Sequence, residues 1–586
     1  MEVCTPAMRE ALHAMAGQAG VVVTAVSAAA AALFGAAVPA WLPPTLIACA
    51  LVVAAARRSG PRWLVGGALA VAMVALVALR ADQDLAGLDL PLPERVDGTA
   101  QLAADPESGR FGTRVEVTVD GRRYMADFDR DTEGVVRALR MGNRVALSGA
   151  VSDLDRAPRG WVLSRHLAGR IRVSEAERVS GTRIWFRAAN GVHELLWRGS
   201  GSMSEQHRAL YVGLVVGDDR RQDELTQFRF RASGLTHLLA VSGQNLVFVL
   251  VALSPLTSRV TFRWRWALGA LAIVGFVLVT RAEPSVLRAA AMALLGLTAA
   301  ATGRTVPGVR TLCLAATGLL VADPMLVHSV GFRLSLAATA GLVLCAQRIW
   351  RLVPGPEWLA RPLGVTLAAQ AGAVPVMAAT FGPTSVLAVP ANLLAEPAAG
   401  LVMTLGMTSG LLAGVVREEL AWVLQLPVRV AVWWVNTVAA GIAELSAPPL
   451  PIAGWVAIGA GLAAATALWR HRGHSAAGRC VLVAALPILL LVRPPLPLTG
   501  GSLELDGGAT LRSCNESWVL EVGGGPGPQD AVSIQEGLWR QGLTRVALVS
   551  AAESTPALVD LAGRLGAVLV VGESRPLARG SPPICA

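Results

Sequence analysis

The sequence predicts a polytopic α-helical membrane protein of about ten or eleven transmembrane helices, with a small β barrel inserted near the N-terminus and a small α/β domain at the end. Three observations predict this class. Of the 586 residues, 53% are hydrophobic and only 16% are charged, which is too apolar for a soluble protein of several domains. Between residues 95 and 173, short alternating apolar patterns replace the long apolar runs. After residue 500, strand and helix patterns alternate.

The charge of the chain comes from arginine alone. All 51 basic residues are Arg, and the formal net charge is +10. Because a Walker A loop needs Lys to reach the nucleotide phosphates, the chain has no standard P-loop ATPase site, and we expect the energy source for any transport in another protein. A positive charge could indicate nucleic acid, but much of the Arg falls in short loops, where membrane orientation explains it.

The seven cysteines contain no CxxC pair and no metal-ligand spacing. Four lie in or beside apolar runs, where Cys packs as a small apolar side chain. Cys514 and Cys585 fall in one C-terminal region, and the sequence leaves open whether they pair. We therefore expect no metal site and no cofactor.

Residues 1–92 contain three apolar runs, near Val21–Val38, Trp41–Ala56 and Trp63–Leu79. The turn between the first two is uncharged, whereas the next holds three arginines. By the positive-inside rule, the N-terminus and that second turn are cytoplasmic, and the chain leaves the third span on the outer side. The short spans and the basic turn indicate a hairpin, not a cleavable signal.

Residues 93–178 are expected to form a small antiparallel β barrel of oligonucleotide-binding (OB) type outside the cytoplasm. Strands are predicted at Arg114–Val119, Arg144–Val151 and Gly160–Ser164, with a turn at Asp120-Gly121. Acidic residues nearly balance its arginines, so a purely structural domain is as good an interpretation as a nucleic-acid binder. Residues 179–200 predict an amphipathic helix in the membrane interface, with a core-facing helix as the alternative.

A polar cluster stands at the head of an apolar run in residues 233–250, SGLTHLLAVSGQNLVFVL. Such groups are costly in a bilayer unless they meet a partner or line a wet cavity. On a continuous helix, His237 and Gln244 share one face, while Ser242 and Asn245 form an i, i+3 pair on another. Ser242-Gly243 is a plausible break. The alternative role is hydrogen bonding between helices.

Several blocks carry a family resemblance. They are RALYVGLVVGDDRRQDELTQFRFRASGLTHLLAVSGQN (208–245), PSVLRAAAMAL (284–294), GFRLSLAATAGL (331–342) and FGPTSVLAVPANLLAEP (381–397). In this order they resemble the competence domain of the ComEC family, the inner-membrane channel that passes single-stranded DNA during natural transformation. The commoner form of the first block has His in place of Asn245, preceded by Leu in place of Gln244.

The resemblance implies a channel domain over residues 201–495 that translocates single-stranded DNA across the cytoplasmic membrane during DNA uptake. It also implies a separate cytoplasmic DNA translocase ATPase and external DNA-receptor proteins, beside the lipid bilayer. A small-solute or lipid transporter and a non-conducting structural subunit remain alternatives. An inverted repeat would favour a transporter, and the sequence shows no such symmetry.

The loop charges predict the orientation. If the run at Gly234 enters from outside, the Arg-rich turns 259–265, 304–310, 348–361 and 470–479 are all cytoplasmic. The turns 323–328, 381–385 and 448–451 are then external, and they contain no Arg. The barrel and the C-terminus are accordingly expected outside a multi-pass cytoplasmic-membrane protein.

Polar residues at membrane depth are the candidates for a DNA pathway, because they need a partner or water. Each of them, taken singly, is equally well explained as an Arg near a helix end or as an interhelical hydrogen bond. We expect no catalytic residues, because His237 and Ser242 would point about 140° apart on one helix and no acid is placed to orient the His. The candidate pathway residues are His237, Ser242, Gln244, Asn245, Arg288, Arg333, Ser335, Asn392 and Glu396.

Residues 500–586 resemble the start of the metallo-β-lactamase-like domain that many ComEC-family members carry. Strands are predicted at SLELDG, Ser517–Gly525 and Thr544–Ser550, with a helix at SIQEGLWRQG. In that fold the strand ending at Ser550 opens onto a His-x-His-x-Asp-His metal motif. Here the residues are AAESTPALVD, and no His follows His474. We therefore predict a truncated, metal-free remnant without nuclease activity, so that any strand degradation requires a separate nuclease.

Overall fold

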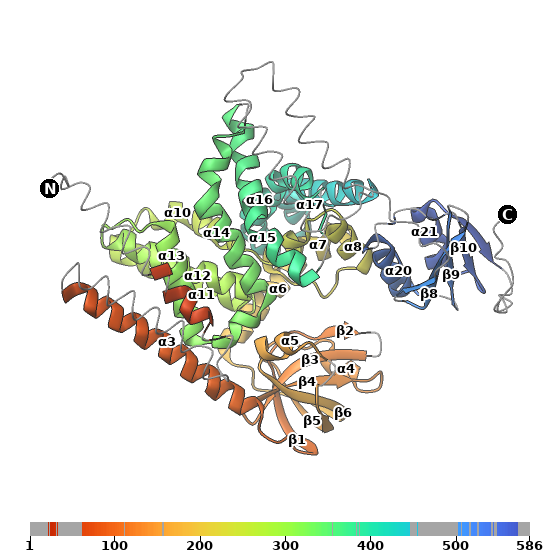
Figure 1. The fold of residues 1–586 in the computed structure, drawn as a ribbon, viewed down its shortest axis with the longest axis horizontal. Helices are drawn as coiled ribbons and strands as arrows, with labels where there is room; N and C mark the ends of the chain where they lie inside the picture. The colour runs from red at the N-terminus through yellow and green to blue at the C-terminus, as the bar shows by residue number, and fades with distance from the viewer. Residues whose placement is uncertain are drawn as a thin grey trace. The chain divides into compact units, whose positions relative to one another are not determined.

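The computed structural model describes most of residues 21–32, 61–445 and 502–571 (Figure 1). The predicted span Trp41–Ala56, the turn 470–479 and the last apolar run near Val481–Val492 lie outside the described residues. The chain divides into two compact units, which are described separately. The first comprises Met1–Arg220, Ala240–Ala346 and Gly400–Arg429, and the second comprises Arg221–Leu239, Gln347–Ala399 and Val430–Ala586.

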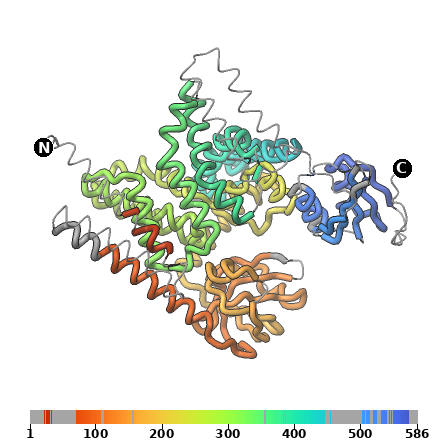
Figure 2. The backbone as a smooth tube through the Cα atoms, in the orientation of Figure 1, coloured from red at the N-terminus to blue at the C-terminus, as the bar shows by residue number. Residues whose placement is uncertain are grey.

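In the first unit, the long helix α3 (Pro61–Leu88) leads into a closed five-stranded barrel (Figure 2). The ring order is β1-β5-β6-β4-β3, and it closes where β1 pairs with β3. The short β2 (Glu107–Gly109) extends the β3 edge. Val117, Val145 and Ile171 are fully buried inside, because alternate residues of each strand face inward. The ring strands are β1 (Arg95–Leu102), β3 (Gly112–Val119), β4 (Arg122–Phe128), β5 (Arg144–Ser152) and β6 (Leu167–Val179).

The structure confirms an inserted barrel and corrects two details of it. The strands β4 and β6 are parallel, because a ring with an odd number of strands cannot alternate direction throughout. The strand predicted at Gly160–Ser164 is instead the helix α5 (Arg159–Ser164). Pro158 supplies a helix-compatible φ at its start, and Trp161 and Val162 pack on a small apolar cluster. Periodicity cannot distinguish strand from helix in so short an apolar run.

After the barrel, α6 (Ile184–Gly199) packs one face on the protein. Ala189, His193, Leu196 and Gly199 are buried at helical spacing. A side chain at Gly199 would overlap the carbonyl oxygen of Gly410, so two helix backbones approach closely here. The predicted position of this helix in the membrane interface stays a prediction.

Six described helices are long and apolar enough to cross a membrane. Two shorter apolar helices, α10 (Gly243–Thr257) and α13 (Gly308–Ala322), accompany them. The polytopic class is thus confirmed, while the predicted total of ten or eleven includes runs outside the described residues. The six are α11 (Phe262–Val279), α12 (Pro284–Ala301), α14 (Val330–Trp350), α15 (Glu357–Phe381), α16 (Ala388–Ala413) and α17 (Glu418–Glu444).

In the second unit, the C-terminal domain has a five-stranded sheet of order β11-β10-β9-β8-β7. Buried apolar residues of α20 (Pro528–Arg540) and α21 (Pro556–Leu565) complete its core. The predicted strands and helix are present, with the strand predicted at Thr544–Ser550 described as β10. The strands are β7 (Ser502–Leu505), β8 (Ala509–Cys514), β9 (Ser517–Val522), β10 (Leu548–Ala551) and β11 (Val568–Val571).

The C-terminal domain contacts the short helix α8 (Glu224–Ala232) of the same unit. Val532 packs on Phe228 and Ala232, and Arg231 forms an ion pair of 2.7 Å with Glu536. The tail domain is therefore attached through a segment that lies within the first family block.

Candidate functional site

The polar cluster predicted at residues 236–245 is divided by a break in the helix. The one-turn helix α9 (Thr236–Leu239) carries His237, and α10 begins at Gly243, with Ser242 as its N-cap. The expected break is thus present, and His237 and Gln244 do not share a continuous helix. The Ser242 hydroxyl accepts a hydrogen bond from the Gln244 N–H at 3.2 Å and donates one to Asn245 Oδ1 at 3.0 Å. The i, i+3 pair is therefore formed.

Asn245 joins α10 to the neighbouring helix α7 (Glu205–Val216). Its side chain is 2% exposed, and Nδ2 donates to the carbonyl oxygen of Leu214 at 2.9 Å. Since both ends of this amide have a partner, Asn245 acts as an interhelical hydrogen bond in the first unit. This is the hydrogen bonding between helices that the sequence left open as the alternative to a pathway role.

Arg288 of α12 lies against the N-terminus of α10. Its side chain is 8% exposed, and Nε donates to Ser335 Oγ on α14 at 2.8 Å. A Cβ on Gly243 would lie 2.7 Å from Arg288 Nη2, so glycine makes this approach possible. Among the described residues, no carboxylate forms an ion pair with Arg288. Two predicted residues, Arg288 and Ser335, are thereby in direct contact.

The positive charge of Arg288 is reinforced by its surroundings. The first turn of a helix presents N–H groups without intrahelical partners and carries a partial positive charge. A guanidinium held beside such a terminus, with no described acid to neutralise it, makes this place attractive to an anion. The N-terminus of α10 and Arg288 together therefore carry a positive charge that no described acid compensates.

The remaining candidates are not part of this network. Gln244 and Arg333 are exposed in the first unit, and His237 is exposed in the second. Asn392 and Glu396 stand four residues apart on α16, also in the second unit. Asn392 is 4% exposed, and its Oδ1 has no hydrogen-bond partner within the part of the chain that the structure describes.

Sequence reasoning missed a polar row on α17. Gln425 is completely buried, Arg429 stacks on Trp422 with its guanidinium carbon 5.2 Å from the ring centre, and Asn436 follows two turns later. The spacings of four and seven residues place these polar groups on one helix face. The signal was present in the sequence, because amide and guanidinium groups within an apolar helix are functional candidates by default.

Sequence reasoning also missed a buried ionic cluster between the barrel and the membrane helices. The Asp218 carboxylate accepts two hydrogen bonds from Arg220, both at 2.7 Å, and one from Arg140 of the barrel at 3.1 Å. His193 approaches it with Nδ1 at 3.4 Å while its Nε2 lies 2.8 Å from the Val279 carbonyl oxygen. Burial alone would raise the pKa of Asp218, but the hydrogen bonds from Arg220 and His193 hold it well below its ordinary value.

A second acid extends this cluster. Asp105 of the barrel accepts from Arg281 at 3.2 Å, and Arg281 also donates to Asn190 of α6 at 2.7 Å. The side chains of Asp105 and Arg281 are each 14% exposed. Within the first unit, paired and largely buried charges therefore hold the barrel on the helices that follow it.

The fold and the buried polar network define a multi-pass membrane protein with an inserted barrel. Residues 214–472 match the family model described as Competence protein. ComE operon protein 3 of Bacillus subtilis (strain 168) is 26% identical over 242 residues, which are 41% of this chain and 31% of that protein. No solved structure gives a significant match. The membrane region of this chain is therefore similar to the competence protein family over residues 214–472, in agreement with the ComEC resemblance of its sequence blocks.

Proposed function

We propose that this chain forms a membrane channel that translocates single-stranded DNA across the cytoplasmic membrane during DNA uptake. The family match and the similarity to ComE operon protein 3 support a role in DNA uptake. The observation that carries the proposal is the buried Arg288, which has no acidic partner in the described region. A DNA strand brings one phosphate per nucleotide, and each phosphate can serve as the counterion that this guanidinium lacks.

The surroundings of Arg288 are better suited to transient contacts with a moving DNA strand than to tight binding of one phosphate. Ser335 orients the guanidinium through one neutral hydrogen bond, which leaves the charge uncompensated between transits. An arginine with a strong acidic partner would have to break that ion pair before it could bind each phosphate. An arginine without an acid can bind the successive phosphates of the strand in turn, because each of them has the same affinity for it. Conduction requires binding that is favourable enough to admit the strand and weak enough to release it.

Within this function, Ser242, Gln244, Asn245, Arg288, Ser335 and Arg333 belong to the pathway region of the first unit. His237, Asn392 and Glu396 are proposed for the second unit. Of these, Asn245 acts by holding α10 on α7 and so supports Arg288 indirectly. The energy source is a separate cytoplasmic translocase, and external receptor proteins deliver the DNA.

The function is tested in a naturally transformable host that lacks its own competence channel gene. The full chain is supplied in trans, and duplex DNA labelled on one strand or on the other is added. We expect one labelled strand to become protected from external nuclease only when the chain is present. If neither strand becomes protected and the uptake of a labelled small solute is restored, the result would favour the transporter alternative.

The proposed orientation places the barrel and C-terminus outside. It is tested with single cysteines at Asp120, in the β3–β4 turn, and at Arg304, in the α12–α13 turn, after the native cysteines are replaced. Both positions are exposed. We expect a membrane-impermeant thiol reagent to label Asp120→Cys in intact cells and Arg304→Cys only after lysis. Labelling of both from one side contradicts the orientation.

We further propose that this polypeptide is not the nuclease of the uptake system. The residues after β10 lack the His-rich motif, and no His follows His474. The purified full chain should leave single-stranded DNA intact in the presence of Zn²⁺ or Mn²⁺. Chelator-sensitive degradation by the purified chain would show that the proposal is wrong.

A further inference from the structure

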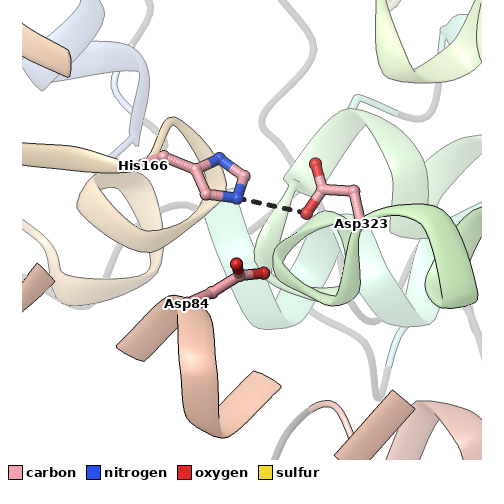
Figure 3. A group of neighbouring side chains, drawn as sticks. All are labelled: Asp84, His166 and Asp323. Atoms are coloured by element: carbon pink, nitrogen blue, oxygen red, sulfur yellow. Dashed lines mark ion pairs between the residues drawn. The ribbon is translucent and has the colours of Figure 1, made fainter. Parts of the chain in front are cut away.

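Three side chains from distant parts of the first unit converge outside the pathway region (Figure 3). Asp84 lies near the end of α3, His166 lies in the turn between α5 and β6, and Asp323 lies between α13 and the short 3-10 helix η1 (Pro324–His328). One ligand atom of each lies within 4.8 Å of the other two, and His166 Nε2 is 3.3 Å from Asp323 Oδ1. All three side chains are half-buried.

Two carboxylates at this separation repel one another. Asp84 has no hydrogen bond or ion pair with any residue that the structure describes, although its carboxylate is turned toward Asp323 (Figure 3). Arg80, one turn earlier, donates to the carbonyl oxygens of Val321 and Ala322 at 2.8 and 2.9 Å. Arg80 and, when protonated, His166 offset part of this repulsion, and a divalent cation between the two carboxylates would neutralise both of them.

The three ligands are held by their own surroundings. Asp323 Oδ1 accepts the Met325 N–H at 2.9 Å, which fixes this carboxylate at the start of η1. His166 has φ of 54°, a left-handed conformation that is uncommon outside glycine and that marks positions fixed by the surrounding structure. The α13 end beside Asp323 is secured by Arg80.

We propose that Asp84, His166 and Asp323 bind one divalent transition-metal ion, of which Zn²⁺ is the best match. Ligand atoms about 2.0–2.2 Å from a tetrahedral Zn²⁺ lie roughly 3.3–3.6 Å apart, and the His166–Asp323 distance already satisfies this. One imidazole and two carboxylates favour Zn²⁺ or Mn²⁺ over Ca²⁺, which prefers oxygen ligands alone. Water completes the coordination.

The ion joins three elements that are spread over more than 200 residues of the sequence, from Asp84 to Asp323. It fastens the end of α3 to the barrel turn and to the α13–η1 junction, so its role is to hold the barrel in place. This site is independent of DNA passage. Sequence spacing could not reveal it, because positions 84, 166 and 323 form no local motif.

The test uses the purified full chain in detergent, dialysed against Zn²⁺ and then against metal-free buffer. We expect about one Zn²⁺ per chain by elemental analysis, and a loss of that ion in Asp84→Asn and His166→Asn. Asparagine tolerates the left-handed conformation of position 166, and at position 84 it keeps the shape of the side chain. Asp89→Asn and His207→Asn, which alter groups outside the cluster, are the matched controls and should retain the ion.

A second readout protects the test against misfolded variants. Zn²⁺ should raise the midpoint temperature of thermal unfolding of the wild-type chain and of both controls, because it binds the folded state. With Co²⁺ as the probe, the wild-type spectrum should show d–d bands without thiolate charge transfer. Absence of bound Zn²⁺ and Mn²⁺ in the wild type, full retention in Asp84→Asn and His166→Asn, or a Co²⁺–thiolate band would each overturn the proposal.

Discussion

Two buried arginine environments in the first unit differ in one respect. At the junction of the barrel and the membrane helices, Arg140 and Arg220 share the Asp218 carboxylate, and their side chains are 14% and 15% exposed. Between α10, α12 and α14, Arg288 is more deeply buried but contacts only neutral groups. Burying a charge without an opposite partner costs several kcal/mol. The paired cluster fixes structure, whereas we propose that the unpaired arginine keeps its charge available for a passing phosphate.

The largest expected effect comes from breaking the paired cluster. Asp218→Asn keeps the shape of the side chain, leaves Arg140 without its acid and leaves Arg220 with only the Asp105 carboxylate at 4.0 Å. We expect the free energy of unfolding to fall by about 3–5 kcal/mol, because uncompensated buried charges are strongly destabilising. Thermal unfolding of the purified protein measures the change. Asp97→Asn, which breaks the exposed Arg95–Asp97 pair, is the control and should leave the midpoint unchanged.

The same cluster predicts a pH dependence with a definite sign. The pKa of Asp218 in the folded protein lies below its unfolded value of about 3.9, so its stabilisation is complete above that value and is lost only as the pH falls through the folded pKa. The penalty of Asp218→Asn should therefore be equal at pH 8 and pH 5. A penalty that vanishes at pH 5 would show that Asp218 is not held ionised by its arginines.

A substitution at Gly243 is the most selective way to displace the Arg288 side chain, because it leaves Arg288 itself unchanged. Gly243→Ala places a methyl group 2.6 Å from Ala289 Cβ and 2.7 Å from Arg288 Nη2. We expect a loss of about 1–3 kcal/mol in stability from overpacking, and reduced DNA uptake per molecule because the guanidinium is displaced. Gly296→Ala on α12, where a Cβ meets nothing within 4 Å, should preserve both. Equal uptake by the two variants would contradict the assigned role of the Arg288 position.

The smallest effects distinguish a residue that supports the structure from a residue of the proposed pathway within the polar cluster. Asn245→Ala removes the hydrogen bond to Leu214 and should cost about 1–3 kcal/mol, because a buried acceptor loses its donor. Gln244→Ala alters an exposed side chain and should leave stability unchanged while lowering uptake. Membrane abundance and uptake of labelled DNA, measured together, distinguish the two. A stable Asn245→Ala variant would show that the α7–α10 bond is dispensable.

The sequence predicted the class of the molecule because its signals are local and repeated. Long apolar runs and alternating strands needed no tertiary information, and the Ser242–Asn245 pair followed from helical spacing. The helix α5 was mistaken for a strand because its six residues offer less than two turns of periodicity. Contacts between segments that lie far apart in the sequence could not be predicted from it. No spacing could show that Asp218 meets Arg140, or that Arg288 meets Ser335 and no described acid.

The most direct test of the central claim compares Arg288→Gln with Arg288→Lys for uptake of labelled DNA, normalised to the amount of protein in the membrane. Glutamine keeps hydrogen-bonding capacity and removes the charge, whereas lysine keeps the charge as a compact ammonium. The account predicts that Arg288→Gln loses at least about tenfold in uptake, equivalent to roughly 1.4 kcal/mol, and that Arg288→Lys retains a substantial part. Normal uptake by Arg288→Gln at normal abundance would contradict it.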